Sequence, residues 1–475
     1  MDGGRSHREG QLVGARPNHP GVKISRRVLP AVILTFMLAV CLGAALPALA
    51  YDADLWTYTR YQYLSDNHGK SNVLSSYADL SLTDMMNGRL EGHVSGWFNL
   101  DSYSGDQYKP TDYDYLRFSQ AYLLYRPTDG QSWYKVGRQY LERVDNFSID
   151  GIAAGWTYDK RWQFMAFAGP PVSFYSTTNK DMLAGAAVIF KPWWKTTLQA
   201  DAYGYFGYDQ GDHLATALRL TQSLPAINGT SYSRLRGLDG QVRDFYTFFA
   251  TFFPDLQTSL SLSYFLLPKT QGIDELANSQ FFSYFGQVFG GTDPYHRISL
   301  NLQAFLGEKV TLLAGAAAKR VLDDRSVNYN WSNLDSNVFN AGVMFNDLFK
   351  KGLSISILGN YVDNQGGDRF FDLTGEVEYQ FHKSFKAAAG VTYMGYRFSY
   401  IQYPDTVNDQ ASVYNLDDHI GSRIYYIDLD YRPSDTHRLM LRAAYEAIDE
   451  RYADAWAFEL GYQWRFSWSG GGANK

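Results

Sequence analysis

The sequence predicts an all-β protein, a transmembrane antiparallel up-and-down β-barrel of about 20 strands, within a range of roughly 18 to 22. Three observations predict this fold. The composition is rich in aromatic residues but low in mean hydropathy, the apolar residues after the N-terminal segment form no long continuous run, and segments of about ten residues alternate between apolar and polar side chains.

Aromatic residues make up 16% of the chain, with 37 Tyr, 30 Phe and 11 Trp, yet the mean hydropathy is −0.32. A membrane barrel has this combination because only alternate strand residues touch lipid, while aromatic girdles lie at the two interfaces. The alternative is an aromatic-rich soluble β-sandwich. No linker or low-complexity tract divides the chain after residue 50, so we expect one large domain.

The N-terminal segment has the features of a secretory signal peptide. Its apolar run, 28–46, follows two arginines and is followed by the small residues Ala48 and Ala50 of a cleavage site. An uncleaved membrane anchor is the alternative. No later apolar run approaches the roughly 18 to 20 residues of a transmembrane helix. We therefore expect a signal peptide at 1–50, a barrel at 51–466 and a C-terminal tail at 467–475.

The mature chain has no thiol, because the single cysteine, Cys41, lies in the segment to be removed. We therefore expect no disulfide, thiolate metal site, iron–sulfur cluster or covalently attached haem. Removal of residues 1–50 also takes away six Lys/Arg and two Asp/Glu, which changes the net charge from −6 to −10. This balance excludes a nucleic-acid-binding protein. We expect no cofactor and no metal.

Alternation is clearest in the last segment, 456–466, where one face reads Trp, Phe, Leu, Tyr, Trp, Phe and the other reads Ala, Glu, Gly, Gln, Arg. A helix would mix these two sets. Soluble antiparallel sheets with one wet face also alternate, so the number of strands and their links must distinguish the two cases. Similar alternation occurs at 90–100, 371–381, 385–393, 425–431 and 438–446.

The links between these segments alternate between tight turns and long excursions, as in outer-membrane barrels with short periplasmic turns and longer external loops. Placing the tight turns and both termini on the periplasmic side gives about twenty strands, the first near 54–64 and the last near 454–466. The stretch 132–169 alternates poorly, which leaves 18 or 22 strands open. Tight turns are expected near 127–131, 191–195, 254–256, 307–309, 350–352, 382–384 and 432–435, and long excursions at 207–240, 268–293, 321–336 and 401–418.

One stretch has apolar residues at helical spacing. It reads DHLATALRLTQSL and begins at Asp212, which is placed to cap a helix. Within a long external link, this stretch predicts an infolded loop or a short plug helix, and the alternative is a surface helix.

Charged side chains on the polar faces of the strands predict a charged aqueous lumen that sorts solutes by charge. The alternative is a set of cross-strand ion pairs that only satisfy one another. The expected lumen-lining residues are Glu91, His93, Arg138, Asp372, Glu376, Glu378, Lys386, Asp428, Asp430, Arg438, Arg442, Glu459 and Arg465.

Enzyme motifs are absent from the mature sequence. Its seven histidines include no H-E-x-x-H, and there is no G-x-S-x-G nucleophile elbow. We therefore name no catalytic residue and expect no enzyme, although a catalytic pair brought together only by folding stays open as an alternative.

Two segments resemble known families. The sequence VGRQYLERVDNFSIDG, at 136–151, resembles a pattern in porin-like barrels, including alginate-export-type channels. This resemblance implies that Arg138 and Asp150 line the solute path or its rim, whereas the alternative is that Arg138 only pairs with a neighbouring carboxylate. The ending GYQWRF is similar to the signal that the outer-membrane assembly machinery recognises, which implies that role for Tyr462, Trp464 and Phe466. Most family members end on that aromatic residue, whereas SWSGGGANK follows here.

Three functions fit such a barrel in a Gram-negative outer membrane, with outer-membrane lipid around it. The preferred one is a porin-like diffusion channel, which can also be a homo-oligomer. The chain also resembles, in size and in its lack of haem motifs, the barrel of a porin–cytochrome conduit. In that case its partners would be periplasmic and outer-surface multihaem cytochromes. The third function is a barrel enzyme. Barrels of about 16 to 18 strands leave aqueous channels and those of about 22 are usually plugged, so strand number fits either of the first two.

Overall fold

The structure is a computed structural model, and the expected signal peptide lies outside the residues that it describes. No helix among the described residues has the length and apolar character needed to cross a membrane. The described residues are 52–66, 69–104, 115–128, 130–141, 144, 147–172, 182–193, 195–207, 211–269, 294–322, 334–347, 349–365, 367–398, 401–404, 411–414, 418–449 and 454–469.

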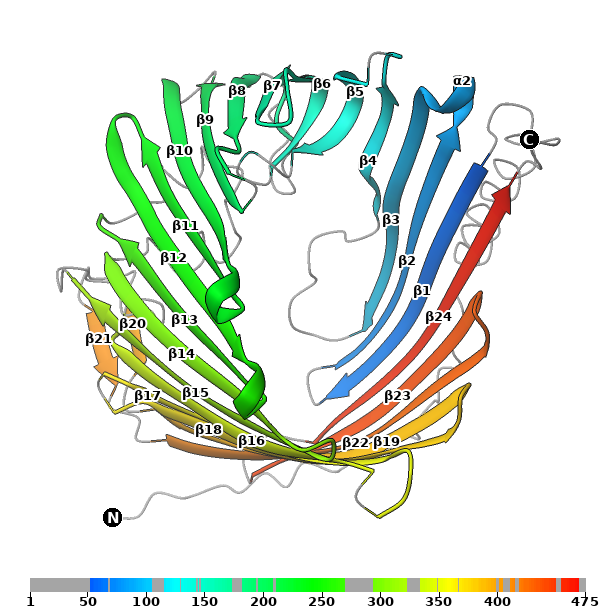
Figure 1. The fold of residues 1–475 in the computed structure, drawn as a ribbon. Coiled ribbons are helices and arrows are strands. Elements are labelled where there is room, and N and C mark those ends of the chain that lie inside the picture. Colours follow the sequence, from blue (N-terminus) through cyan, green and yellow to red (C-terminus); the bar gives the residue numbers. More distant parts are fainter. Residues whose placement is uncertain are drawn as a thin grey trace, which may run out of the picture. The chain divides into compact units, whose positions relative to one another are not determined.

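Within these residues, 22 strands form one antiparallel sheet (Figure 1). Its first half contains β1 (Asp52–Asp66), β2 (Gly69–Asp84), β3 (Leu90–Ser104), β4 (Tyr115–Tyr125), β5 (Ser132–Leu141), β6 (Phe147–Thr157), β7 (Trp162–Gly169), β8 (Met182–Phe190), β9 (Thr196–Gly207), β10 (Gly211–Leu224) and β11 (Gly229–Leu238). Its second half contains β12 (Gln241–Phe253), β13 (Thr258–Leu267), β14 (Tyr295–Leu306), β15 (Val310–Val321), β16 (Ser336–Asn346), β17 (Leu353–Asn364), β18 (Arg369–His382), β19 (Phe385–Phe398), β22 (Asp418–Ser434), β23 (His437–Ile448) and β24 (Ala455–Ser469).

The sheet closes because its first and last strands pair. β1 pairs with β2 on one side and with β24 on the other, where Asp52 lies opposite Ser469 and Ser65 opposite Trp456. Every other strand pairs with its neighbours in sequence, except that β19 pairs with β22. The intervening β20 (Ile401–Pro404) and β21 (Ala411–Tyr414) form a separate two-stranded sheet. The predicted up-and-down barrel is therefore confirmed, with a strand number inside the expected range.

The two ends of the barrel differ in their links. Each of the seven predicted tight turns joins an even-numbered strand to the following odd-numbered one, so all of them lie at one end. The short helices α2 (Met85–Gly88), η2 (Pro225–Ile227) and η3 (Pro254–Leu256) also make turns at that end. Asp52 lies opposite both Thr83 and Ser469, so the barrel also begins and ends there. The seven predicted turns therefore share one end, but the other end also has tight links, such as Asp239–Gly240 between β11 and β12.

The segment 207–240 is not the predicted external excursion. It contains β10 and β11, joined by η2, and these two strands raise the number from about twenty to 22. The helix predicted from Asp212 is wrong: Leu214 and Leu218 are 54% and 52% exposed on one face of β10, while Ala215 and Ala217 are buried on the other. A spacing of four residues fits both a helix and a strand, and here pairing with β9 and β11 decides.

The other expected excursions do lie between strands. The segment 268–293 separates β13 from β14, 321–336 separates β15 from β16, and 401–418 includes β20 and β21. At the C-terminus, β24 continues past the expected barrel boundary at Phe466 and ends at Ser469.

The register separates an outward from an inward face. The outer face of a closed sheet packs against no other strand, so its large apolar side chains stay exposed, as Ile298, Leu300 and Leu302 do at 49%, 45% and 40%. The residues between them, such as Ser299 and Asn301, face inward, and their register partners Ser263 and Ser261 on β13 are polar too. Continued from strand to strand, the register gives an apolar outer face and a largely polar inner face.

The wall at β6 to β8 departs from this pattern because its inner face is apolar as well. Phe147, Ile149 and Leu183 are buried on that face, while Ile152 and Trp156 are exposed on the outer face. Apolar residues on both faces explain the poor alternation at 132–169. The inner cluster comprises Leu141, Val144, Phe147, Ile149, Ala153, Phe167, Leu183, Ala187, Tyr203 and Ala215.

Candidate channel lumen

Five of the strands near the C-terminus carry the largest group of predicted lumen residues, and the register places these residues on the inward face. On β18 and β19, Lys386 Nζ lies 2.7 Å from Glu378 Oε2, and Asp372 accepts hydrogen bonds from Asn360 Nδ2 at 2.9 and 3.1 Å. Glu376 accepts a hydrogen bond of 2.7 Å from the hydroxyl of Tyr426. These carboxylates hold their positions through cross-strand partners.

The same face continues over β22, β23 and β24. Arg438 forms two hydrogen bonds with Asp430, at 2.9 and 2.7 Å, and Arg442 Nε lies 3.7 Å from Asp428 Oδ1. Across the closing seam, Arg465 Nη2 lies 2.7 Å from Asp54 Oδ2, and Arg60 Nη1 lies 3.9 Å from Glu459 Oε2. Ion pairs therefore connect the strands on the inward face, as the cross-strand alternative expected.

Glu91 and His93 lie on the inward face of β3. Glu91 forms an ion pair with Arg126. His93 Nδ1 lies 3.1 Å from the hydroxyl oxygen of Ser81, and its Nε2 lies 3.6 Å from Asp79 Oδ2. These partners fix the imidazole ring on the wall of the barrel.

Arg138 has a different position from the other predicted lumen residues. The register pairs it with Asp150, on the same face as the exposed Val136 and Ile152, which is the outward face. Arg138 donates from Nε and Nη2 to the two carboxylate oxygens of Asp150 at 2.7 and 2.6 Å. The geometry therefore agrees with the alternative for Arg138, in which this residue only pairs with a neighbouring carboxylate.

A second group of inward charges, on β9 to β15, was not predicted from the sequence. Asp201 and Asp244 are buried, and they pair with Arg219 and Arg236. The two arginines of the sequence RLR, at alternate positions of β11, could have indicated this group, but their segment was assigned to a loop. The basic side chains of this group are Arg219, Arg234, Arg236, Arg297 and Lys319, all on the inward face by register.

The two groups differ in charge. The wall at β10 to β15, which we call the basic arc, carries the five basic residues above beside the buried Asp244. The wall at β18 to β22, which we call the acidic arc, carries five carboxylates beside two basic residues: Asp372, Glu376, Glu378, Asp428 and Asp430, with Lys386 and Arg432. Such a separation produces an electric field inside a low-dielectric wall.

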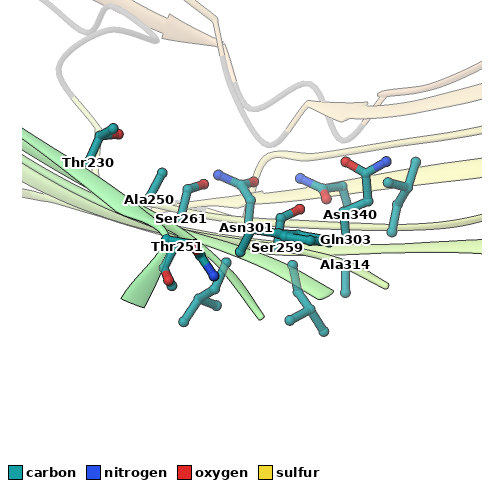
Figure 2. A pocket seen from close by; sticks show the side chains of 14 residues that line it. Thr230, Ala250, Thr251, Ser259, Ser261, Asn301, Gln303, Ala314 and Asn340 are labelled. Carbon is teal, nitrogen blue, oxygen red and sulfur yellow. The ribbon is translucent and has the colours of Figure 1, made fainter. Parts of the chain in front are cut away.

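Uncharged polar side chains line the inner wall on β13 to β16, beside the charges of the basic arc. Two pockets, of about 500 and 380 Å³, share Asn301 and Asn340 in their linings. Figure 2 shows Ser261, Asn301 and Asn340 pointing to the same side of the sheet. No group of three His, Cys, Asp or Glu side chains among the described residues is placed to hold a metal ion.

The predicted assembly residues Tyr462, Trp464 and Phe466 lie on the outward face of β24. Their register partners on β1 are Thr59, Thr57 and Leu55. The aromatic row therefore lies along the seam where the barrel closes.

No protein-family model matches the sequence. No curated protein matches it either. Among solved structures, the chain is similar to a BenF-like porin from Pseudomonas fluorescens Pf-5, with a TM-score of 0.44 and 12% identity over 88% of this chain and 100% of that one. It is similar to the outer membrane protein OpdK of Pseudomonas aeruginosa, with a TM-score of 0.43 and 14% identity over 88% and 100%. For OccK7 (OpdD) of Pseudomonas aeruginosa, the TM-score is 0.42 and the identity 11% over 88% and 99%.

The closed antiparallel sheet, apolar outside and charged inside, has the architecture of a transmembrane β-barrel.

Proposed function

We propose that this chain is an outer-membrane porin that conducts small hydrophilic solutes through its barrel. The observation that carries this proposal is the distribution of charge on a closed sheet: ionised side chains gather on the inward face, and large apolar side chains cover the outward face. A lipid-embedded cylinder with water inside is the environment that satisfies both faces.

The basic and acidic arcs give the channel its selectivity. Charges on a pore wall raise the local concentration of counter-ions and exclude ions of the same sign. Because the arcs carry opposite charges, a solute with both a positive and a negative group is oriented as it passes. We therefore propose that the lumen residues act as charge filters, with the exception of the outward-facing Arg138.

Conductance tests the proposal. The purified protein is reconstituted in planar bilayers, and the reversal potential is measured across a KCl gradient. We expect stable open channels whose ion preference weakens at high ionic strength, because salt screens the wall charges. A silent barrel that co-purifies with haem-staining polypeptides would overturn the porin in favour of the cytochrome sheath. A polypeptide that stays monodisperse without detergent would overturn the membrane location.

We also propose that the assembly machinery of the outer membrane reads the aromatic row of β24. What supports this role is the position of Tyr462, Trp464 and Phe466 on the lipid-facing side of the closing seam. The test is the assembly experiment described in the Discussion.

A further inference from the structure

One part of the inner wall has the composition of a solute-binding surface. It lies on β12 to β16, and we call it the amide wall. Among the described residues, the linings of its two pockets contain a single charged side chain, that of Arg297. The hydrogen-bonding side chains of the amide wall on the inward face are Ser259, Ser261, Ser263, Ser299, Asn301, Gln303 and Asn340.

The centre of the amide wall is built around Gly315. Its register partners are Asn301 on β14 and Asn340 on β16. A Cβ at Gly315 would come 2.5 Å from Asn340 Oδ1 and 2.7 Å from Asn301 Oδ1. The missing side chain therefore lets two amides converge from opposite sides above the backbone. Within the described residues, neither amide has a hydrogen-bond partner, so both are available to a solute.

Aromatic rings lie further along the strands, two to three inward positions from Asn301 and beyond Ser299. Tyr246 lies opposite Phe265, and the rings of Phe265 and Tyr295 are 5.3 Å apart. All three line the same pocket as Asn301 and Asn340. From Arg297 to Gln303 the surface spans seven residues of β14, whose six steps correspond to about 20 Å. A solute along this wall meets aromatic surface at one end and amides and hydroxyls at the other.

The pocket lining at the amide end carries no ionised side chain to hold a simple anion or cation. A carboxylate accepts hydrogen bonds but donates none, and a cation needs acceptors or a counter-charge. Amide and hydroxyl side chains donate and accept in nearly equal numbers, as the hydroxyl groups of a sugar do. Aromatic rings supply an apolar surface for the C–H face of a sugar ring.

We propose that the amide wall is a binding site for neutral sugars or polyols, in which Asn301 and Asn340 bond hydroxyl groups at one end and Tyr246 and Phe265 support a sugar ring at the other. This inference rests on the proposed channel function, because the solute reaches the wall through the lumen. Arg297, at the aromatic end, supplies donors to one terminal hydroxyl or acidic group.

Isothermal titration calorimetry of the detergent-purified barrel tests the site without requiring an open channel. The probes are sucrose, maltotriose and, as an aromatic anion, sodium benzoate. We expect a sugar to bind, and we expect the double variant Asn301→Ala/Asn340→Ala to weaken its affinity by about tenfold or more, because two hydrogen-bonding groups are lost. The matched control is Gln463→Ala, which removes an inward amide on β24, far from the pocket residues.

Gly315→Ala is an independent second variant. It keeps every hydrogen-bonding group but forces both amides to move, so we expect it to weaken sugar binding while the barrel still shows heat-modifiable migration in electrophoresis. Binding of benzoate without either sugar would overturn the proposal, and so would sugar binding that is equal in all variants.

Current recordings separate this proposal from the channel function. A sugar that binds the wall should interrupt the open current of the wild type, and less so that of the double variant. A barrel without conductance that still binds sugar contradicts the proposed channel and not the amide wall. Open channels without any sugar binding contradict the amide wall alone.

Discussion

Arg236 and Asp244 form a bidentate ion pair across β11 and β12. Arg236 Nη2 lies 2.6 Å from Asp244 Oδ2, its Nε lies 3.0 Å from Asp244 Oδ1, and the side chain of Asp244 is only 1% exposed. Arg234 Nη2 lies 3.5 Å from Asp244 Oδ1. One buried carboxylate therefore holds two guanidinium groups of the basic arc in place.

Asp244→Asn removes this charge, and we expect two effects. Breaking a buried ion pair leaves its partners uncompensated, so the barrel should lose about 3 kcal/mol of stability. The additional uncompensated positive charge should also shift the reversal potential toward anion preference. Thermal unfolding in detergent and bilayer recordings measure the two effects. Asp372→Asn is the control, because that carboxylate bonds the neutral amide of Asn360. Equal stability losses in the two variants would contradict the role of Asp244.

Neutralising carboxylates of the acidic arc should shift the ion preference in the same direction as Asp244→Asn. Neutralising Glu376 and Glu378 together, as Glu376→Gln and Glu378→Gln, should reduce the permeability of cations relative to anions, because two carboxylates leave the inner wall. The reversal potential at about 0.1 M salt should show the shift, and high salt should diminish it. Asp255→Asn, in the turn η3 outside the inner wall, should leave the potential unchanged. A double variant with wild-type selectivity would show that these carboxylates serve only as cross-strand partners.

The strands near the C-terminus could be predicted from the sequence because each has one apolar and one polar face. Strands whose inner face is buried inside the barrel do not meet this condition, because both of their faces are apolar. Ile149 and Leu183 are fully buried inside the barrel, so β6 and β8 are apolar on both faces and show no alternation. In β10, Leu214 and Leu218 lie four residues apart, a spacing common to helix and strand.

The inward-facing residues of the candidate site could be predicted only where their strands could be predicted. Residues such as Asp428 and Arg442 face inward because their strands alternate strictly. Arg138 faces outward, although the resemblance to porin-like barrels implied a position on the solute path. Arg234 and Arg236 were missed since their strand was taken for a loop. Asn301 and Asn340 converge above Gly315 because of the register between three strands. No pattern within a single strand predicts that register.

β6 and β7 approach each other at Gly151 so closely that only glycine fits there. A Cβ at Gly151 would come 2.1 Å from the carbonyl oxygen of Ala168, and its register partner Gly137 has a φ of +115°. We expect Gly151→Ala to destabilise the barrel by roughly 1 to 3 kcal/mol through overpacking. Gly375→Ala is the matched control, because nothing lies within 4 Å of its Cβ position. Thermal midpoints that fall equally in both variants would contradict this explanation.

Phe466→Ala tests the assembly role of the terminal aromatic row. Phe466 lies opposite Leu55 at the seam, on the face toward lipid. We expect lower levels of heat-modifiable barrel in outer-membrane fractions, because the variant damages the proposed recognition signal. Gln463→Ala, on the inward face of the same strand, should assemble normally. Wild-type amounts of folded Phe466→Ala protein would count against recognition of this row.

The assignment of the two faces predicts opposite tolerance of charge at adjacent positions of β14. Leu300 lies in the middle of this strand on the outward face and is 45% exposed, whereas Ser299 beside it faces inward. An arginine at the lipid-facing midplane of a barrel costs about 2 to 4 kcal/mol, while a lumen position meets water. We therefore expect Leu300→Arg to lower the folding stability in lipid vesicles by that amount, and Ser299→Arg to change it by less than about 1 kcal/mol. Ser299→Arg should instead increase the anion preference of the conductance. If both arginines are tolerated equally in vesicles, the outward face of β14 does not lie against lipid, and the membrane-spanning orientation of the barrel fails with it.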